Sequence, residues 1–101
     1  MLPHVVRFNA ERDEALETYV ELVAIGNLGQ AENGDEAVER LAKRLTQLLE
    51  MADMPVTLKA SGVEESMLST LASEAAGQWT ASYNPREAAE AEMEAIYRAA
   101  F

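Results

Sequence analysis

Apolar residues recur at helical spacing along the first half of the chain. The first stripe follows positions i, i+3, i+4 and i+7 and consists of Leu16, Tyr19, Val20 and Val23. Acidic residues occupy the opposite side, so the stripe predicts an amphipathic helix over residues 11–25 that ends in the glycine-containing stretch 26–29. The second stripe consists of Val38, Leu41, Ala42, Leu45, Leu48 and Leu49. It predicts a longer helix that stops near Ala52, because Pro55 lacks an N–H and restricts the residue before it.

Polar residues predict where these helices begin. Asn33 followed by Glu36 has the spacing of a capping box for the second helix. Ser61 followed by Glu64 has the same spacing and predicts the start of a third helix. Gly77 closes this third helix, whose inward stripe consists of Met67, Leu68, Leu71, Ala72, Ala75 and Ala76.

The start of the last helix is open by about four residues. Asn84, Pro85 and Glu87 suit its N-cap, N1 and N3 positions. Its stripe consists of Met93, Ile96, Tyr97 and Ala100.

These elements predict an all-α protein with a single domain over residues 1–101. Residues 54–60 are expected to be an extended connector, and the N-terminal segment 1–9 is a candidate fifth helix. The fold is therefore expected to be a small antiparallel bundle of four to five helices. Its predicted core includes Leu16, Val20, Val23, Leu41, Leu45, Leu48, Leu68, Leu71, Ile96 and Tyr97.

Composition narrows the range of partners. The chain has 18 Asp and Glu residues against 8 Lys and Arg, which gives a formal net charge of −10. Nucleic acid and anionic membrane surfaces would repel such a chain, so neither is expected as a partner. The chain contains no cysteine and no apolar run close to the roughly 20 residues that cross a bilayer. A cytoplasmic location is therefore expected, without disulfides or thiolate metal sites.

Catalytic motifs are not evident. His4 is the only histidine, and a metal site needs three or four converging ligands. Carboxylate pairs such as Glu17 and Glu21 are best interpreted as solvated helix faces. The five glycines are scattered, whereas phosphate-binding loops need clustered glycines. We therefore predict no catalytic, cofactor-binding or metal-ligating residue in this chain.

One segment does carry the side chains that line binding pockets. Residues 79–86 combine aromatic, hydroxyl, amide and guanidinium groups, and the four candidate residues are Trp79, Thr80, Asn84 and Arg86. Two interpretations stay open. In the first, the loop is structural, with Trp79 filling the core, Asn84 capping a helix and Arg86 pairing with a carboxylate. In the second, the loop is a vestigial pocket.

Several short motifs give the chain a family resemblance. They are Leu2-Pro3-His4-Val5-Val6-Arg7-Phe8-Asn9, Met54-Pro55-Val56-Thr57-Leu58, Gly62-Val63-Glu64-Glu65 and the ending that starts Asn84-Pro85-Arg86. Together they resemble the C-terminal helical domain of iron-containing (group III) alcohol dehydrogenases, in the dehydroquinate synthase-like superfamily. The resemblance implies that the nicotinamide-binding domain, and the Asp and three His that hold the catalytic metal, lie in sequence preceding the point that matches Met1. It also implies that the loop before Asn84 approaches the substrate end of the cleft. It further implies a later start of the last helix, near Ala89, as the alternative to a start at Asn84.

Two hypotheses of function follow. In the first, the chain resembles the C-terminal part of an iron-dependent, NAD(P)-linked alcohol dehydrogenase. It is then expected to bind no cofactor and to be inactive alone, and a partner protein would supply the nucleotide-binding half. In the second, it is a free-standing acidic helical module for protein interaction or dimerisation. A homodimer is expected in that case, because loss of preceding helices would uncover apolar residues, namely Leu2, Val5, Val6 and Phe8.

Overall fold

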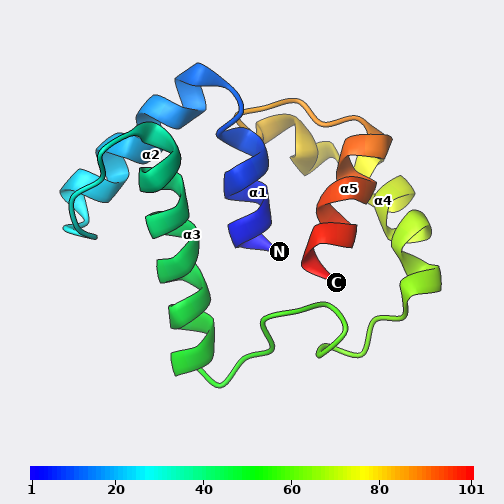
Figure 1. The fold of residues 1–101 in the computed structure, drawn as a ribbon. Helices are drawn as coiled ribbons and strands as arrows, with labels where there is room; N and C mark the ends of the chain where they lie inside the picture. Colours follow the sequence, from blue (N-terminus) through cyan, green and yellow to red (C-terminus); the bar gives the residue numbers. More distant parts are fainter. The chain divides into compact units, whose positions relative to one another are not determined.

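The computed structural model describes residues 1–101 and consists of helices joined by loops, without a strand (Figure 1). The α-helices are α1 (Leu2–Asn9), α2 (Asp13–Ile25), α3 (Gly34–Met51), α4 (Leu68–Ala76) and α5 (Glu90–Ala100). Two short 3₁₀ helices, η1 (Glu65–Met67) and η2 (Trp79–Tyr83), precede and follow α4. The predicted all-α class is confirmed, and the N-terminal segment is the fifth helix.

The chain forms two units, Leu2–Met54 and Pro55–Phe101, and Met1 belongs to the second. In the N-terminal unit, α3 packs against both α1 and α2. The buried cluster between these helices consists of Val6, Val23, Ala37, Val38 and Leu41. The expectation that the N-terminal segment leaves Val6 uncovered is therefore wrong, because α1 buries this side chain against α3.

The ends of α2 and α3 follow from local backbone chemistry. Both helices end in a Schellman motif with a non-glycine residue in the left-handed region, Asn27 at φ 51° and Asp53 at φ 54°. In α3, the N–H of Asp53 donates to the Glu50 carbonyl at 3.0 Å, and the N–H of Met54 donates to the Leu49 carbonyl at 2.9 Å. The predicted stop before Pro55 is confirmed.

The start of α3 is also as predicted, with one difference. Asn33 is the N-cap, and its Oδ1 accepts a hydrogen bond from the Glu36 N–H at 2.9 Å. The Glu36 carboxylate accepts from the N–H of Glu32 at 2.8 Å, one residue before the N-cap that a capping box would use. Glu36 therefore fastens the α2–α3 loop as well as the helix start.

In the C-terminal unit, α4 packs against α5 and buries Leu68, Ala72 and Ala100. The predicted cap at Ser61 is wrong, because the Ser61 hydroxyl donates to the Thr57 carbonyl at 3.0 Å in a preceding turn. In the predicted extended connector over residues 54–60, residues 56–60 form bends and turns. Gly77 is the C-cap of α4, as predicted.

The start of α5 decides between the two alternatives. The helix begins at Glu90 with Ala89 as its N-cap, so the later start is right and Asn84 is not the cap. The N–H of Ala89 donates to Glu92 Oε2 at 2.9 Å, and the N–H of Leu58 donates to the Ala100 carbonyl at 2.9 Å. These bonds attach both ends of α5 to neighbouring loop backbone.

The predicted core is only partly right. Val23, Leu41 and Leu68 are buried, whereas Leu16, Leu45, Leu71, Ile96 and Tyr97 are half-buried. Val20 and Leu48 are exposed, and so is Met67, which was predicted to face inward on the third helix. Leu48 is exposed because α1 is about 12 Å long and cannot cover the full length of α3, which is roughly 27 Å.

Candidate functional site

The segment with pocket-type side chains is displayed on η2 and the loop that follows it. Trp79 and Tyr83 stand at the two ends of η2, and their side chains are 73% and 76% exposed. The two rings meet edge to face, with centroids 5.7 Å apart and planes at 84°. Such an arrangement is favourable for aromatic pairs, so each ring restricts the other. The prediction that Trp79 fills the core is wrong.

Hydrogen bonds hold this segment in shape. The Ser82 hydroxyl donates to the Trp79 carbonyl at 2.7 Å, across the turn of η2. The Asn84 side-chain amide donates to the Arg86 carbonyl, so Asn84 closes the loop locally instead of capping α5. Thr80 is exposed on the same turn. Of the four candidate residues, the structure therefore presents Trp79 and Thr80 to solvent.

Arg86 connects the loop to α5. Its Nη2 donates to Glu92 Oε1 at 3.2 Å, and Glu92 also accepts from the Ala89 N–H. The guanidinium is well covered, with the side chain only 18% exposed. The predicted pairing of Arg86 with a carboxylate is confirmed. The loop thus has a fixed base at Arg86 and exposed aromatic side chains at its other end, and its assignment as a vestigial pocket stays a prediction.

The donor set of this chain does not suit iron. His4 is half-buried on α1, and burial lowers the pKa of its imidazole below the usual value. No group of three or more His, Cys, Asp or Glu side chains lies close enough together to hold a metal ion.

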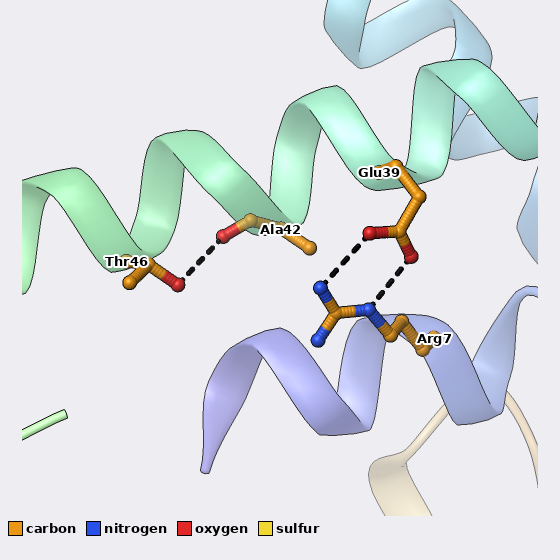
Figure 2. A network of polar contacts seen from close by, with 4 residues as sticks. All are labelled: Arg7, Glu39, Ala42 and Thr46. Carbon is orange, nitrogen blue, oxygen red and sulfur yellow. Dashed lines mark hydrogen bonds and ion pairs between the residues drawn. The ribbon is translucent and has the colours of Figure 1, made fainter. Parts of the chain in front are cut away.

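A cluster of charged side chains lies between α1 and α3, where the sequence analysis did not predict one. Arg7 forms two hydrogen bonds to Glu39, from Nε at 2.7 Å and from Nη2 at 3.0 Å (Figure 2). The hydrogen bond from Arg7 lowers the pKa of Glu39 and raises that of Arg7. Within α3, Arg40 forms an ion pair with Glu36 one helical turn before it, with 2.9 Å between Nη2 and Oε1. Arg7 and Glu39 are 32 residues apart in sequence, so no local spacing signals this pair.

This cluster lines a surface hollow of about 550 Å³, whose lining residues are Arg7, Glu36, Glu39, Arg40, Lys43 and Thr46. Two of its three cations are neutralised by the two glutamates. Thr46 is satisfied within α3, since its hydroxyl donates to the Ala42 carbonyl at 3.1 Å (Figure 2). The arrangement therefore attaches α1 to α3.

Comparison with known proteins identifies one family. The family model described as Fe-containing alcohol dehydrogenase family, C-terminal, matches residues 1–101. A comparison with curated protein sequences found no match. None of the helices is long and apolar enough to span a membrane.

Proposed function

Because the chain belongs to the Fe-containing alcohol dehydrogenase family, as a C-terminal domain of that family, we propose that it serves an iron-dependent, NAD(P)-linked alcohol dehydrogenase. The observation that carries the proposal is the match of the family model along residues 1–101. The all-helical fold agrees with it.

Within this proposal, residues 1–101 supply neither the metal site nor the dinucleotide site. One histidine and no cysteine are too few ligands, and the acidic side chains do not converge on one point. We propose that a nicotinamide-binding part with its own metal ligands provides both sites, and that residues 1–101 are inactive alone. A cytoplasmic location is part of the same proposal and is supported by the cysteine-free composition.

The role we propose for the segment 79–86 is to line the alcohol end of the cleft. Its aromatic rings are exposed, its backbone is held by Ser82 and Asn84, and its base is anchored by the Arg86–Glu92 ion pair. A rigid loop with exposed rings contacts a small alcohol at little cost in conformational entropy. Trp79 and Thr80 are the residues that we expect to touch the substrate.

The proposal is tested first on the purified chain. After dialysis with iron, elemental analysis should find no stoichiometric metal, and NADH should not bind with better than about millimolar affinity. Alcohol-dependent reduction of NAD⁺ or NADP⁺ should be absent. Stoichiometric iron that is lost in a His4→Ala variant, or alcohol oxidation by the chain alone, would overturn the proposed division of labour.

The second test adds the other half. A family enzyme's nicotinamide-binding part, expressed separately, should regain alcohol dehydrogenase activity when residues 1–101 are added. Trp79→Ala should then reduce kcat/KM, while Met51→Ala, an exposed apolar change on α3, serves as the matched control. An unchanged kcat/KM in the Trp79→Ala variant would show that the loop does not line the cleft. The family assignment would be unaffected.

The alternative function is an interaction module that acts without a dehydrogenase partner. It is favoured by the exposed apolar side chains of the N-terminal unit, which include Leu22, Ile25, Leu48 and Met51. Failure of every complementation mixture, together with stable self-association, would favour this alternative.

A further inference from the structure

The structure sets one asparagine of this chain apart from the others. The backbone nitrogen that follows an asparagine can attack the side-chain amide carbon and displace ammonia. The attack needs a following N–H that is free of other bonds, and a following residue without bulk. The chain has asparagine at positions 9, 27, 33 and 84, and each can be judged by these two requirements.

Three of the asparagines lack a reactive neighbour. Asn84 is followed by Pro85, whose nitrogen carries no hydrogen. The N–H after Asn9 donates to a carbonyl of α1 at 3.0 Å, and the N–H after Asn27 donates to a carbonyl of α2 at 3.1 Å. Asn9 is also buried, with only 2% of its surface exposed. At positions 9 and 27 a hydrogen bond must therefore break before the nitrogen can attack.

Asn33 meets both requirements. It is exposed to water, and the residue that follows is Gly34, which has no side chain to hinder attack. Gly34 is the first residue of α3, so its N–H has no acceptor within the helix. Packing also favours glycine at this position, because a Cβ there would lie 3.0 to 3.2 Å from side-chain atoms of Leu16.

From these contacts we infer that Asn33 is the residue at which this chain deamidates without an enzyme. The Gly34 nitrogen forms a bond to Asn33 Cγ, the Cγ–Nδ2 bond breaks, and the Gly34 proton leaves with the amide group as ammonia. Water then opens the five-membered imide that results. Opening at Cγ gives aspartate, and opening at the main-chain carbonyl gives isoaspartate. The inference goes beyond the proposed function, because it needs neither metal, cofactor nor partner.

The cap of α3 slows this reaction. Asn33 Oδ1 accepts a hydrogen bond from the Glu36 N–H at 2.9 Å, and ψ at Asn33 is 174°. Ring closure needs Cβ, Cα, C and the Gly34 nitrogen close to one plane, and this ψ keeps the nitrogen out of that plane. The Glu36 carboxylate accepts from the Glu32 N–H and from Arg40, which holds the loop closed. Helix ends open locally at little free-energy cost, so the reaction proceeds when the first turn of α3 opens.

The two products should differ in their effect on the N-terminal unit. Aspartate caps a helix as well as asparagine does, and its charge is favourable at a helix N-terminus. Isoaspartate adds one main-chain carbon before Gly34. The cap bond from the Glu36 N–H and the contact of Gly34 with Leu16 cannot both be kept after that addition. Because Leu16 packs against the buried cluster, the isoaspartate form should lose packing between α2 and α3.

The experiment is to age the full chain at mildly alkaline pH and to locate the modified residue by peptide mass spectrometry. Asn33 should be converted before the other three asparagines. Release of ammonia should fall to background in Asn33→Ser, which retains a capping side chain. Glu36→Ala, which frees the loop, should speed the reaction about fivefold, the factor expected for loss of one hydrogen bond. The matched control is Asp35→Ala, which removes the same charge from the same turn and should have a smaller effect.

Chromatographic separation of the aged products tests the role of the cap. The aspartate form and the Asn33→Asp variant should unfold at a temperature close to that of the original chain, and the isoaspartate form should unfold at a lower one. Earlier conversion of another asparagine, equal rates in the folded chain and in urea, or equal rates in Glu36→Ala and Asp35→Ala would each overturn the inference. An isoaspartate form as stable as the aspartate form would overturn the role assigned to the cap.

Discussion

Three leucines on one stripe of α3 should differ sharply in how much they stabilise the fold. Leu41 is 6% exposed and belongs to the buried cluster, Leu45 packs partly against it, and Leu48 is 45% exposed. Burial of a leucine is worth about 2 kcal/mol, and the cavity that truncation leaves adds to the loss, so Leu41→Ala should cost about 3 kcal/mol. Leu48→Ala leaves no closed cavity and should cost about 1 kcal/mol or less. Leu45→Ala should fall between them.

The measurement is urea denaturation of the three variants, followed by helical circular dichroism. Alanine and leucine have similar helix propensities, so the difference reports packing and not helix formation. A gap of about 2 kcal/mol between Leu41→Ala and Leu48→Ala corresponds to roughly thirtyfold in the folded-to-unfolded ratio. Equal losses at the two positions would refute the reasoning and show that α3 buries its whole stripe.

Three further predictions concern charge and exposure. Asp53 follows the C-terminus of α3, where the helix dipole disfavours negative charge, so Asp53→Asn should stabilise the chain by about 0.5 kcal/mol. Asp35 lies in the first turn of α3, where negative charge is favourable, so Asp35→Asn should destabilise the chain by about the same amount. Thermal unfolding midpoints of the two variants measure both effects. The pKa of Glu39 is lowered in the folded state by Arg7, so its stabilising contribution is present above pH 4.5 and is lost as the pH falls below that value. The Glu39→Gln variant should therefore lose less free energy of unfolding than the original chain between about pH 5 and pH 3.5. Urea titrations that give the same pH dependence for both proteins would contradict the pairing. Trp79 is the only tryptophan, and its emission should resemble that of tryptophan in water and be quenched readily by iodide; a blue-shifted, protected emission would show that the ring is covered.

Local chemistry explains which elements could be predicted. The end of α3 before Pro55, its N-cap at Asn33 and the closure of α4 at Gly77 depend on backbone hydrogen bonds and φ preferences within a few residues. Ser61 shows how such a motif can mislead. Its hydroxyl found an acceptor in the preceding turn, at Thr57, and the S-x-x-E spacing alone does not exclude that competitor.

The candidate loop was predictable in composition but not in placement. Residue types drew attention to Trp79, Thr80, Asn84 and Arg86, and the pairing of Arg86 with a carboxylate followed from its charge. Whether Trp79 is buried depends on which helices pass over it, and periodicity carries no information about that. A large aromatic side chain is usually buried, so its exposure here became evident only from the structure.

By itself the sequence determined the helical class, most helix ends and the family motifs, because these depend on residue identity and on neighbours within about one helical turn. Tertiary structure decided which part of each apolar stripe is covered. It buried Val6 and Leu41, and it left Leu48 in solvent because the shorter α1 covers only part of α3. It also brought Arg7 to Glu39 and formed the hollow lined by Val20, Ala24 and Ala31. These features join residues that are distant along the chain or depend on the space that neighbouring elements leave, and no local pattern encodes either.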